Sequence, residues 1–77
     1  MKILKYRTLL RAEPEGGYTV IVPSLPGCIT YGKDINEALK MAKEAIELCI
    51  ESLQAHGEEI PSDNDVLEYT TLIEFPE

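Results

Sequence analysis

The sequence is poor in the residues from which catalytic and metal sites are usually built. Its 77 residues include one histidine, two cysteines, one phenylalanine and no tryptophan. A catalytic Cys-His pair would need a thiol beside His56, and two thiols alone do not complete a zinc site. Because Cys49 falls on an apolar stripe and His56 near a predicted helix end, we interpret both as structural residues. The chain is therefore predicted not to be an enzyme, and no cofactor is expected.

Long hydrophobic runs are absent as well. The apolar runs are only a few residues long, whereas a membrane-spanning helix needs about 20 apolar residues. Within the first ten residues, "MKILKYRTLL", Lys5 and Arg7 interrupt the continuous apolar stretch of a secretion signal. Without an export signal the two cysteines are expected to stay reduced. We therefore predict a cytoplasmic protein with no membrane partner.

Basic residues are missing from the second half of the chain. Residues 1–43 hold all seven Lys and Arg against four acids, whereas residues 44–77 hold ten acids and no base, so +3 and −10 give the net charge of −7. An acidic half repels phosphate, and direct binding of nucleic acid by this chain is not expected. The asymmetry favours a basic protein partner, and a merely solvated acidic surface is the alternative.

The length and the first half of the pattern predict one domain that begins with a hairpin. A chain this short supports a single core, so residues 1–77 are predicted to form one domain. Residues 3–12 alternate apolar and charged side chains, as in a strand with one buried face. Gly16 and Gly17 provide the positive φ of a tight turn, and a β-rich second strand follows over residues 18–22.

The stretch "VPSLPGCITYGKD" predicts a stiff connection into a third strand. Pro23 ends the second strand because it has no amide hydrogen to donate. Pro26 and Gly27 suit a type II turn, and residues 28–32 are short enough for the third strand. Backbone geometry accounts for these residues. A rigid apolar turn also loses little entropy on binding, so Leu25 and Pro26 are candidate contacts for a partner.

The middle of the chain has the clearest pattern, that of an amphipathic helix. Asp34 is placed to cap its first turn, with Glu37 three residues later as in a capping box, and Gly57 ends it. Apolar residues recur at spacings of three and four over about six turns. This stripe comprises Ile35, Ala38, Leu39, Ala42, Ala45, Ile46, Cys49 and Leu53. Three acids fall off the stripe and are candidate partner contacts: Glu44, Glu47 and Glu51.

A last strand is expected after the helix. Residues 66–75 alternate apolar and polar side chains beyond a polar linker. The predicted fold is thus α+β, in the order β-β-β-α-β, with an antiparallel-rich sheet and one long helix packed on one face. Such a sheet leaves an open face and exposed edges, which predict a homo-oligomer, either a dimer or a tetramer.

Several short motifs follow one another in a characteristic order. They are a Gly-Gly-Tyr hairpin, a strand ending in proline, a Leu-Pro-Gly-Cys turn, a strand closing with glycine and a helix opening with Glu-Ala. The residues that form this series are Gly16, Gly17, Tyr18, Pro23, Leu25, Pro26, Gly27, Cys28, Gly32, Glu37 and Ala38. With this series, and over roughly residues 3–75, the chain resembles the N-terminal domain of HicB-like antitoxins.

The resemblance implies a fold, a partner and a mode of action. Such domains have a partial ribonuclease-H-like fold without ribonuclease activity. They bind HicA, a small basic ribonuclease toxin, and cover its catalytic histidine, which agrees with the acidic second half of this chain. Family members usually continue into a DNA-binding segment, whereas this sequence ends at Glu77. The candidate toxin contacts are the Leu25 and Pro26 turn and the three helix glutamates.

Two alternative functions are consistent with the sequence. One is an orphan protein-interaction domain whose partner is not a toxin. The other is a degenerate metal-dependent nuclease, for which Asp34, Asp63 and Asp65 are the available carboxylates. The "DND" stretch lacks the glycine and final glutamate of a calcium loop, so we interpret it as a solvated linker.

Overall fold

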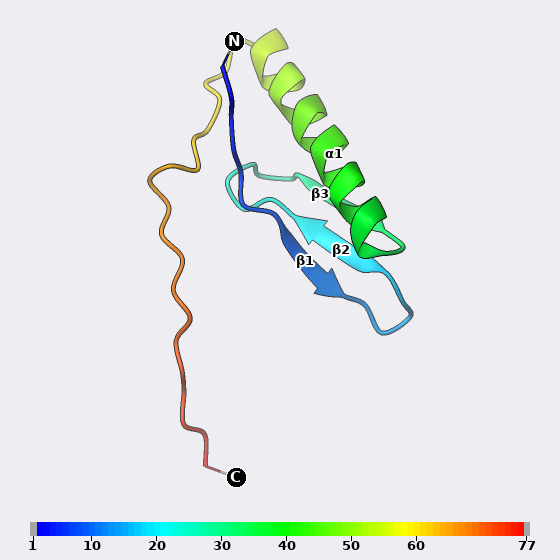
Figure 1. Cartoon of the computed structure of the whole chain (residues 1–77). Coiled ribbons are helices and arrows are strands. Elements are labelled where there is room, and N and C mark those ends of the chain that lie inside the picture. Colours follow the sequence, from blue (N-terminus) through cyan, green and yellow to red (C-terminus); the bar gives the residue numbers. More distant parts are fainter. Residues whose placement is uncertain (1, 77) are drawn as a thin grey trace.

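The computed structural model describes residues 2–76 and places three strands before one long helix. The elements are β1 (Leu9–Ala12), β2 (Tyr18–Ile21), β3 (Ile29–Gly32) and α1 (Ile35–Ala55). The strands form one antiparallel sheet in the order β1-β2-β3, and α1 packs across one of its faces (Figure 1). The predicted α+β class and the long helix on one face are confirmed.

The two turns of the sheet form where glycine and proline predict them. Gly16 and Gly17 have φ values of 106° and 80° between β1 and β2, and Gly27 has a φ of 80° before β3. These left-handed conformations are costly for residues with a side chain. In the second turn the amide of Leu25 donates to the carbonyl of Val22 at 3.0 Å. Local backbone chemistry therefore places both turns.

Both ends of α1 also follow from local chemistry. Asp34 Oδ1 accepts a hydrogen bond from the Glu37 amide at 2.8 Å, and Glu37 Oε1 accepts one from the Lys33 amide at 3.0 Å. This reciprocal arrangement satisfies donors that the first turn leaves free. His56 is the C-cap, and Gly57 follows with a φ of 67°. The predicted start and end of the helix are confirmed.

The core is small and divided into two clusters. The first consists of Val20, Ala38 and Ala42, with Leu10 and Tyr18 packed against it. The second consists of Val22, Leu25 and Cys28, against which Tyr6 and the second half of α1 pack. Helix and sheet approach closely at Gly32, where an added Cβ would overlap the backbone of Ala38. Small residues on both surfaces therefore set the distance between the two layers.

Two predictions about the strands are wrong. The first strand was expected over residues 3–12 but begins only at Leu9, because its partner β2 ends at Ile21, which lies opposite Leu9. The last strand was expected over residues 66–75, yet within the described residues no strand follows α1. That segment is extended but lies along no sheet edge, and a strand requires a neighbour for its backbone groups.

The apolar stripe on α1 is buried only in part. Ala38 and Ala42 are buried, whereas Ile35 and Leu39 are 51% and 50% exposed. α1 packs mainly over β3 and β2, and on its other side Leu39 lines an open groove between α1 and the residues before β1. The apolar stripe therefore contributes to the core at Ala38 and Ala42 and is half exposed at Ile35 and Leu39.

Candidate protein-interaction surface

The three predicted helix acids form one exposed surface, which we call the acidic helix face. Glu44, Glu47 and Glu51 are all exposed, and their spacing places them on one side of α1. None of them takes part in an ion pair in the described part of the chain. The helix macrodipole adds partial negative charge towards its C-terminal end. This face therefore presents unneutralised negative charge to the solvent.

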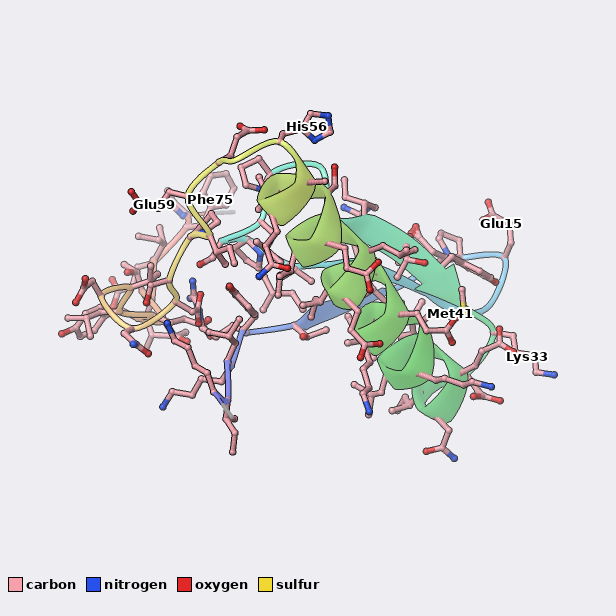
Figure 2. All side chains as sticks on the ribbon, turned by 90° about the horizontal axis from the view of Figure 1, so that it is seen from above. Glu15, Lys33, Met41, His56, Glu59 and Phe75 are labelled. Atoms are coloured by element: carbon pink, nitrogen blue, oxygen red, sulfur yellow. The ribbon has the colours of Figure 1, made fainter. Side chains whose placement is uncertain are left out.

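More acids follow the end of α1. Glu58 and Glu59 are exposed there, and Figure 2 shows Glu59 and His56 directed outward at this end of the molecule. His56 Nδ1 lies 2.7 Å from the carbonyl oxygen of Ser52 in the preceding turn of the helix. Its ring thus closes the helix end, in agreement with the structural role predicted for it.

The predicted turn contacts are placed differently from each other. Leu25 is 2% exposed and packs in the second core cluster, under the inward side of α1, whereas Pro26 is exposed. The acidic helix face points away from the sheet. The structure therefore does not bring Leu25 together with the three glutamates in one patch. Of these two residues, Pro26 is the one whose side chain is exposed.

Most of the motif residues serve the fold. Gly16, Gly17 and Gly27 have the positive φ that their turns require, and Gly32 allows the close approach of α1. Three further motif residues contribute to the core: Tyr18, Cys28 and Ala38. Glu37 belongs to the helix cap.

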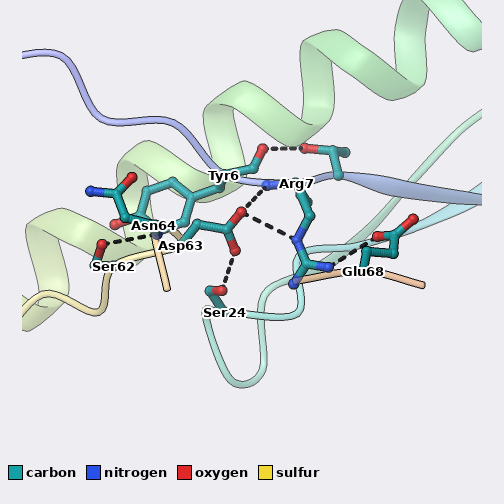
Figure 3. Close-up of polar contacts among 8 residues, drawn as sticks. Tyr6, Arg7, Ser24, Ser62, Asp63, Asn64 and Glu68 are labelled. Atoms are coloured by element: carbon teal, nitrogen blue, oxygen red, sulfur yellow. Dashed lines mark hydrogen bonds and ion pairs between the residues drawn. The ribbon is translucent and has the colours of Figure 1, made fainter. Parts of the chain in front are cut away.

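The structure reveals a polar cluster that the sequence did not predict, which we call the Asp63 clamp (Figure 3). The Asp63 side chain is 8% exposed and accepts hydrogen bonds from the Arg7 amide at 3.1 Å and from Arg7 Nε at 3.2 Å. The hydroxyl of Ser24 donates to its other oxygen. Nearby, the Tyr6 hydroxyl donates to the Pro61 carbonyl at 2.7 Å. The clamp joins the first residues, the Pro-Gly turn and the segment after α1.

The electrostatics of the clamp favour an ionised Asp63. The Ser24 hydroxyl, with the Arg7 backbone amide and side chain, holds the pKa of Asp63 below its ordinary value of 3.8, although burial opposes this shift. Burial, followed by the charge of Asp63, raises the pKa of Tyr6. Asp63 is thus committed to internal hydrogen bonds. Its partners lie 39 and 56 positions away in sequence, which explains why no local pattern identified it.

The carboxylates considered for a metal ion are not gathered together. Asp34 caps α1, Asp63 is held in the clamp and Asp65 is exposed. Among residues 2–76 there is no group of three or more side chains suited to hold a metal ion. Within the same residues, no helix combines the length and the apolar character needed to span a membrane.

Comparisons with known proteins agree with the motif series. A family model described as HicB_like antitoxin of bacterial toxin-antitoxin system matches residues 6–77. The chain is 51% identical over 61 residues to a UPF0150 protein of Thermoplasma acidophilum, covering 79% of this chain and 88% of the relative. It is 30% identical over 73 residues to Antitoxin HicB of Escherichia coli K12, covering 95% of this chain. The match takes in 53% of that antitoxin, so the chain spans about half its length.

Proposed function

Because the chain belongs to the HicB-like antitoxin family, we propose that it binds and occludes a small basic ribonuclease toxin of the HicA type. In this proposal residues 1–77 act as one domain in the cytoplasm, without catalysis or a cofactor of their own. The observation that carries the proposal is the acidic helix face, with its three exposed and unpaired carboxylates.

The proposed mechanism follows from charge. A ribonuclease needs positive surface to hold the phosphates of its substrate, and an acidic protein competes for that surface. Complementary charge also speeds the encounter of two proteins, and this effect weakens as salt increases. The acidic helix face is rigid, because its residues lie within a regular 21-residue helix. Little backbone conformational entropy is therefore lost when a partner docks on it.

The test is a kinetic measurement of binding to a catalytically inactive HicA-type toxin. We expect the association rate constant to fall severalfold between low and physiological salt, with a smaller change in dissociation. The variant Glu44→Lys/Glu47→Lys/Glu51→Lys is expected to slow association about tenfold or more. It should keep the circular dichroism of the unmodified chain, because all three side chains are exposed.

A matched pair of single variants separates local from general charge effects. Glu51→Lys lies on the acidic helix face, whereas Glu15→Lys makes the same charge change in the exposed β1-β2 turn. Slower association for the first alone supports the proposed face. Equal effects of the two variants would indicate that association depends on net charge and not on this face. If both variants bind as tightly and as fast as the unmodified chain, the interface lies elsewhere, and exposed Pro26 is the next candidate.

The nuclease alternative is tested separately. Asp63 accepts hydrogen bonds from Ser24 and Arg7, and Asp34 caps α1, so both carboxylates have structural roles in the described fold. We expect the purified chain to leave RNA intact with and without Mg²⁺. Cleavage that requires Mg²⁺ and is abolished by Asp34→Asn would replace the proposal with the nuclease function.

A further inference from the structure

The last residues of the described chain form an apolar surface with no cover. Residues 66–76, which we call the tail, run extended away from the sheet and helix (Figure 1). Its five most exposed large hydrophobic side chains are Leu67 at 75%, Tyr69 at 82%, Leu72 at 90%, Ile73 at 76% and Phe75 at 82%. Exposed apolar surface of this extent is typical of an interaction site.

A groove beside the residues that lead into β1 is open to receive such a segment. It lies between the extended residues before β1 and the helix, with a volume of about 460 Å³. The apolar side chains that line it are Leu4, Tyr6, Leu39, Ala42, Ile46 and Ile50. The half-exposed Leu39 noted above belongs to this lining. β1 is the edge of the sheet on this side, so its outer backbone groups have no neighbouring strand within the described sheet.

The two rows of side chains on β1 and its lead-in differ in chemistry. Tyr6 and Leu10 pack against the core clusters on the helix side. The alternate positions carry positive charge at Lys5, Arg7 and Arg11. A strand added at this edge therefore meets an apolar row on the helix side and a basic row on the other side.

The tail has the complementary pair of rows. One row is apolar apart from a threonine and consists of Leu67, Tyr69, Thr71, Ile73 and Phe75. The alternate row carries the acids Glu68 and Glu74. Cross-strand pairs of opposite charge and of apolar side chains both stabilise neighbouring strands. Within one copy, the two rows already show this complementarity outside the strands, because Arg7 Nη1 lies 3.0 Å from Glu68 Oε1.

In each copy, the residues just before β1 are already in contact with a later segment of their own chain. Tyr6 and Arg7 bind Pro61 and Asp63, so the segment after α1 is fixed beside the lead-in to β1. From Glu68 onward the chain then leads away from its own sheet, giving an elongated molecule of 51 × 29 × 21 Å. The exposed end of the tail therefore lies apart from its own sheet and helix.

We propose that the tail of each copy adds as a strand to the β1 edge of a second copy. Its apolar row enters the groove beside α1 of that copy, and Glu74 faces the basic row. Exchange of two tails is reciprocal, so it closes a two-fold dimer and covers both tails and both grooves. Glu47 of the acidic helix face borders this groove, whereas Glu44 and Glu51 lie outside its lining, and the inference does not depend on the toxin proposal.

Oligomeric mass tests the first part. Light scattering on the full chain should give twice the 8.6 kDa of one copy. Ile73→Lys with Phe75→Lys should raise the dissociation constant of the dimer at least about tenfold and yield monomers. The control Leu48→Lys places the same charge on a 65% exposed residue of α1 outside the groove lining, and it should remain a dimer. A monomeric unmodified chain, or dimers of the tail variant, would overturn the proposal.

Photo-crosslinking tests the second part and identifies the surface that receives the tail. A benzoylphenylalanine in place of Tyr69 is irradiated in a mixture of tagged and untagged copies. Crosslinks between the two kinds of copy, mapped by mass spectrometry to residues 2–12 or to α1 in the groove, are expected. Crosslinks only within one copy would mean that the tail folds back on its own edge. Crosslinks between copies at Ile29 or Tyr31, exposed residues of β3, would place the tail elsewhere and overturn the proposed groove.

Discussion

The sheet-and-helix body and the tail carry the same alternating pattern with opposite outcomes. In β2, Val20 is fully buried between the sheet and α1, whereas Leu72 of the tail is 90% exposed. Both segments have the period of two that suits a strand. In the body, β2 has a neighbouring strand on each side and a helix over one face, which the described tail does not have. Alternation thus identifies a segment able to form a strand, and a neighbouring edge decides whether it does.

The strongest test of the body is the contact between its two layers. Gly32→Ala places a methyl group against the backbone of Ala38, which cannot move without shifting α1. We expect a loss of about 3 kcal/mol or more in the free energy of unfolding, measured by urea denaturation. Gly16→Ala is the control, since its added Cβ meets nothing within 4 Å and it incurs only the cost of its φ of 106°. That cost is about 1–2 kcal/mol. Equal losses would indicate that the layers can separate freely.

The same substitution in the two regions measures the difference between them. Leu25→Ala removes a side chain that is 2% exposed and should cost about 2–5 kcal/mol. Leu72→Ala removes one that is 90% exposed and should change stability by less than about 0.5 kcal/mol in dilute solution. A concentration series sharpens the comparison. If the tail docks on a second copy, the cost of Leu67→Ala, which truncates a 75% exposed side chain of the row that enters the groove, rises with protein concentration, whereas that of Leu25→Ala is already present at the lowest concentration.

The clamp at the junction of body and tail predicts a dependence on acidity. The pKa of Asp63 is held below 3.8 in the folded chain, so its contribution is complete above that value and is lost as the pH falls below it. We expect the melting temperature of the unmodified chain to decrease when the pH is lowered below about 4. The variant Asp63→Asn should have a lower melting temperature at pH 7, and its melting temperature should decrease less on acidification. Ser24→Ala, which removes the first of its hydrogen-bond donors, should reduce the acid sensitivity in the same direction.

Proteolysis provides the readout that separates the clamp from general acid effects. Arg7 and Asp63 hold the segment from which the tail departs. Cleavage at the Arg7 peptide bond by trypsin should therefore be faster in Asp63→Asn than in the unmodified chain at the same temperature. An unchanged cleavage rate would show that the clamp does not order this region.

Local chemistry made part of the structure predictable from sequence. The turn glycines, the Asp34 and Glu37 cap and the glycine after α1 each act within a few residues, so the sequence displays them directly. The expected exposure of the three helix glutamates followed from helical spacing and is confirmed. Membership in the HicB-like family, expected from the motif series, is confirmed by the match over residues 6–77.

The failures all concern contacts between distant segments. Leu39 belongs to the apolar stripe but faces an open groove, because α1 packs mainly over β3 and β2, and helical spacing alone does not show which strands a helix covers. Leu25 looked like a surface contact in its turn, although it packs beneath α1. Asp63 looked like part of a solvated linker because its partners, Arg7 and Ser24, lie far away in sequence. The tail alternates like a strand, yet no strand of the described residues lies beside it.

The smallest expected effect concerns the two thiols, and it tests how firmly the body is closed. Burial raises the pKa of Cys28 to about 11, with a further contribution from its hydrogen bond to Cys49. At pH 8 only about one Cys28 in a thousand is then the reactive thiolate. In the variant Cys49→Ser, Cys28 should react with a disulfide reagent slowly in the folded chain and rapidly in denaturant. In the variant Cys28→Ser, the half-buried Cys49 of the folded chain should react faster than Cys28 does in the folded variant Cys49→Ser. If Cys28 reacts in the folded chain as fast as in the denatured one, the Pro-Gly turn opens readily, and the body differs from the tail less than its packing indicates.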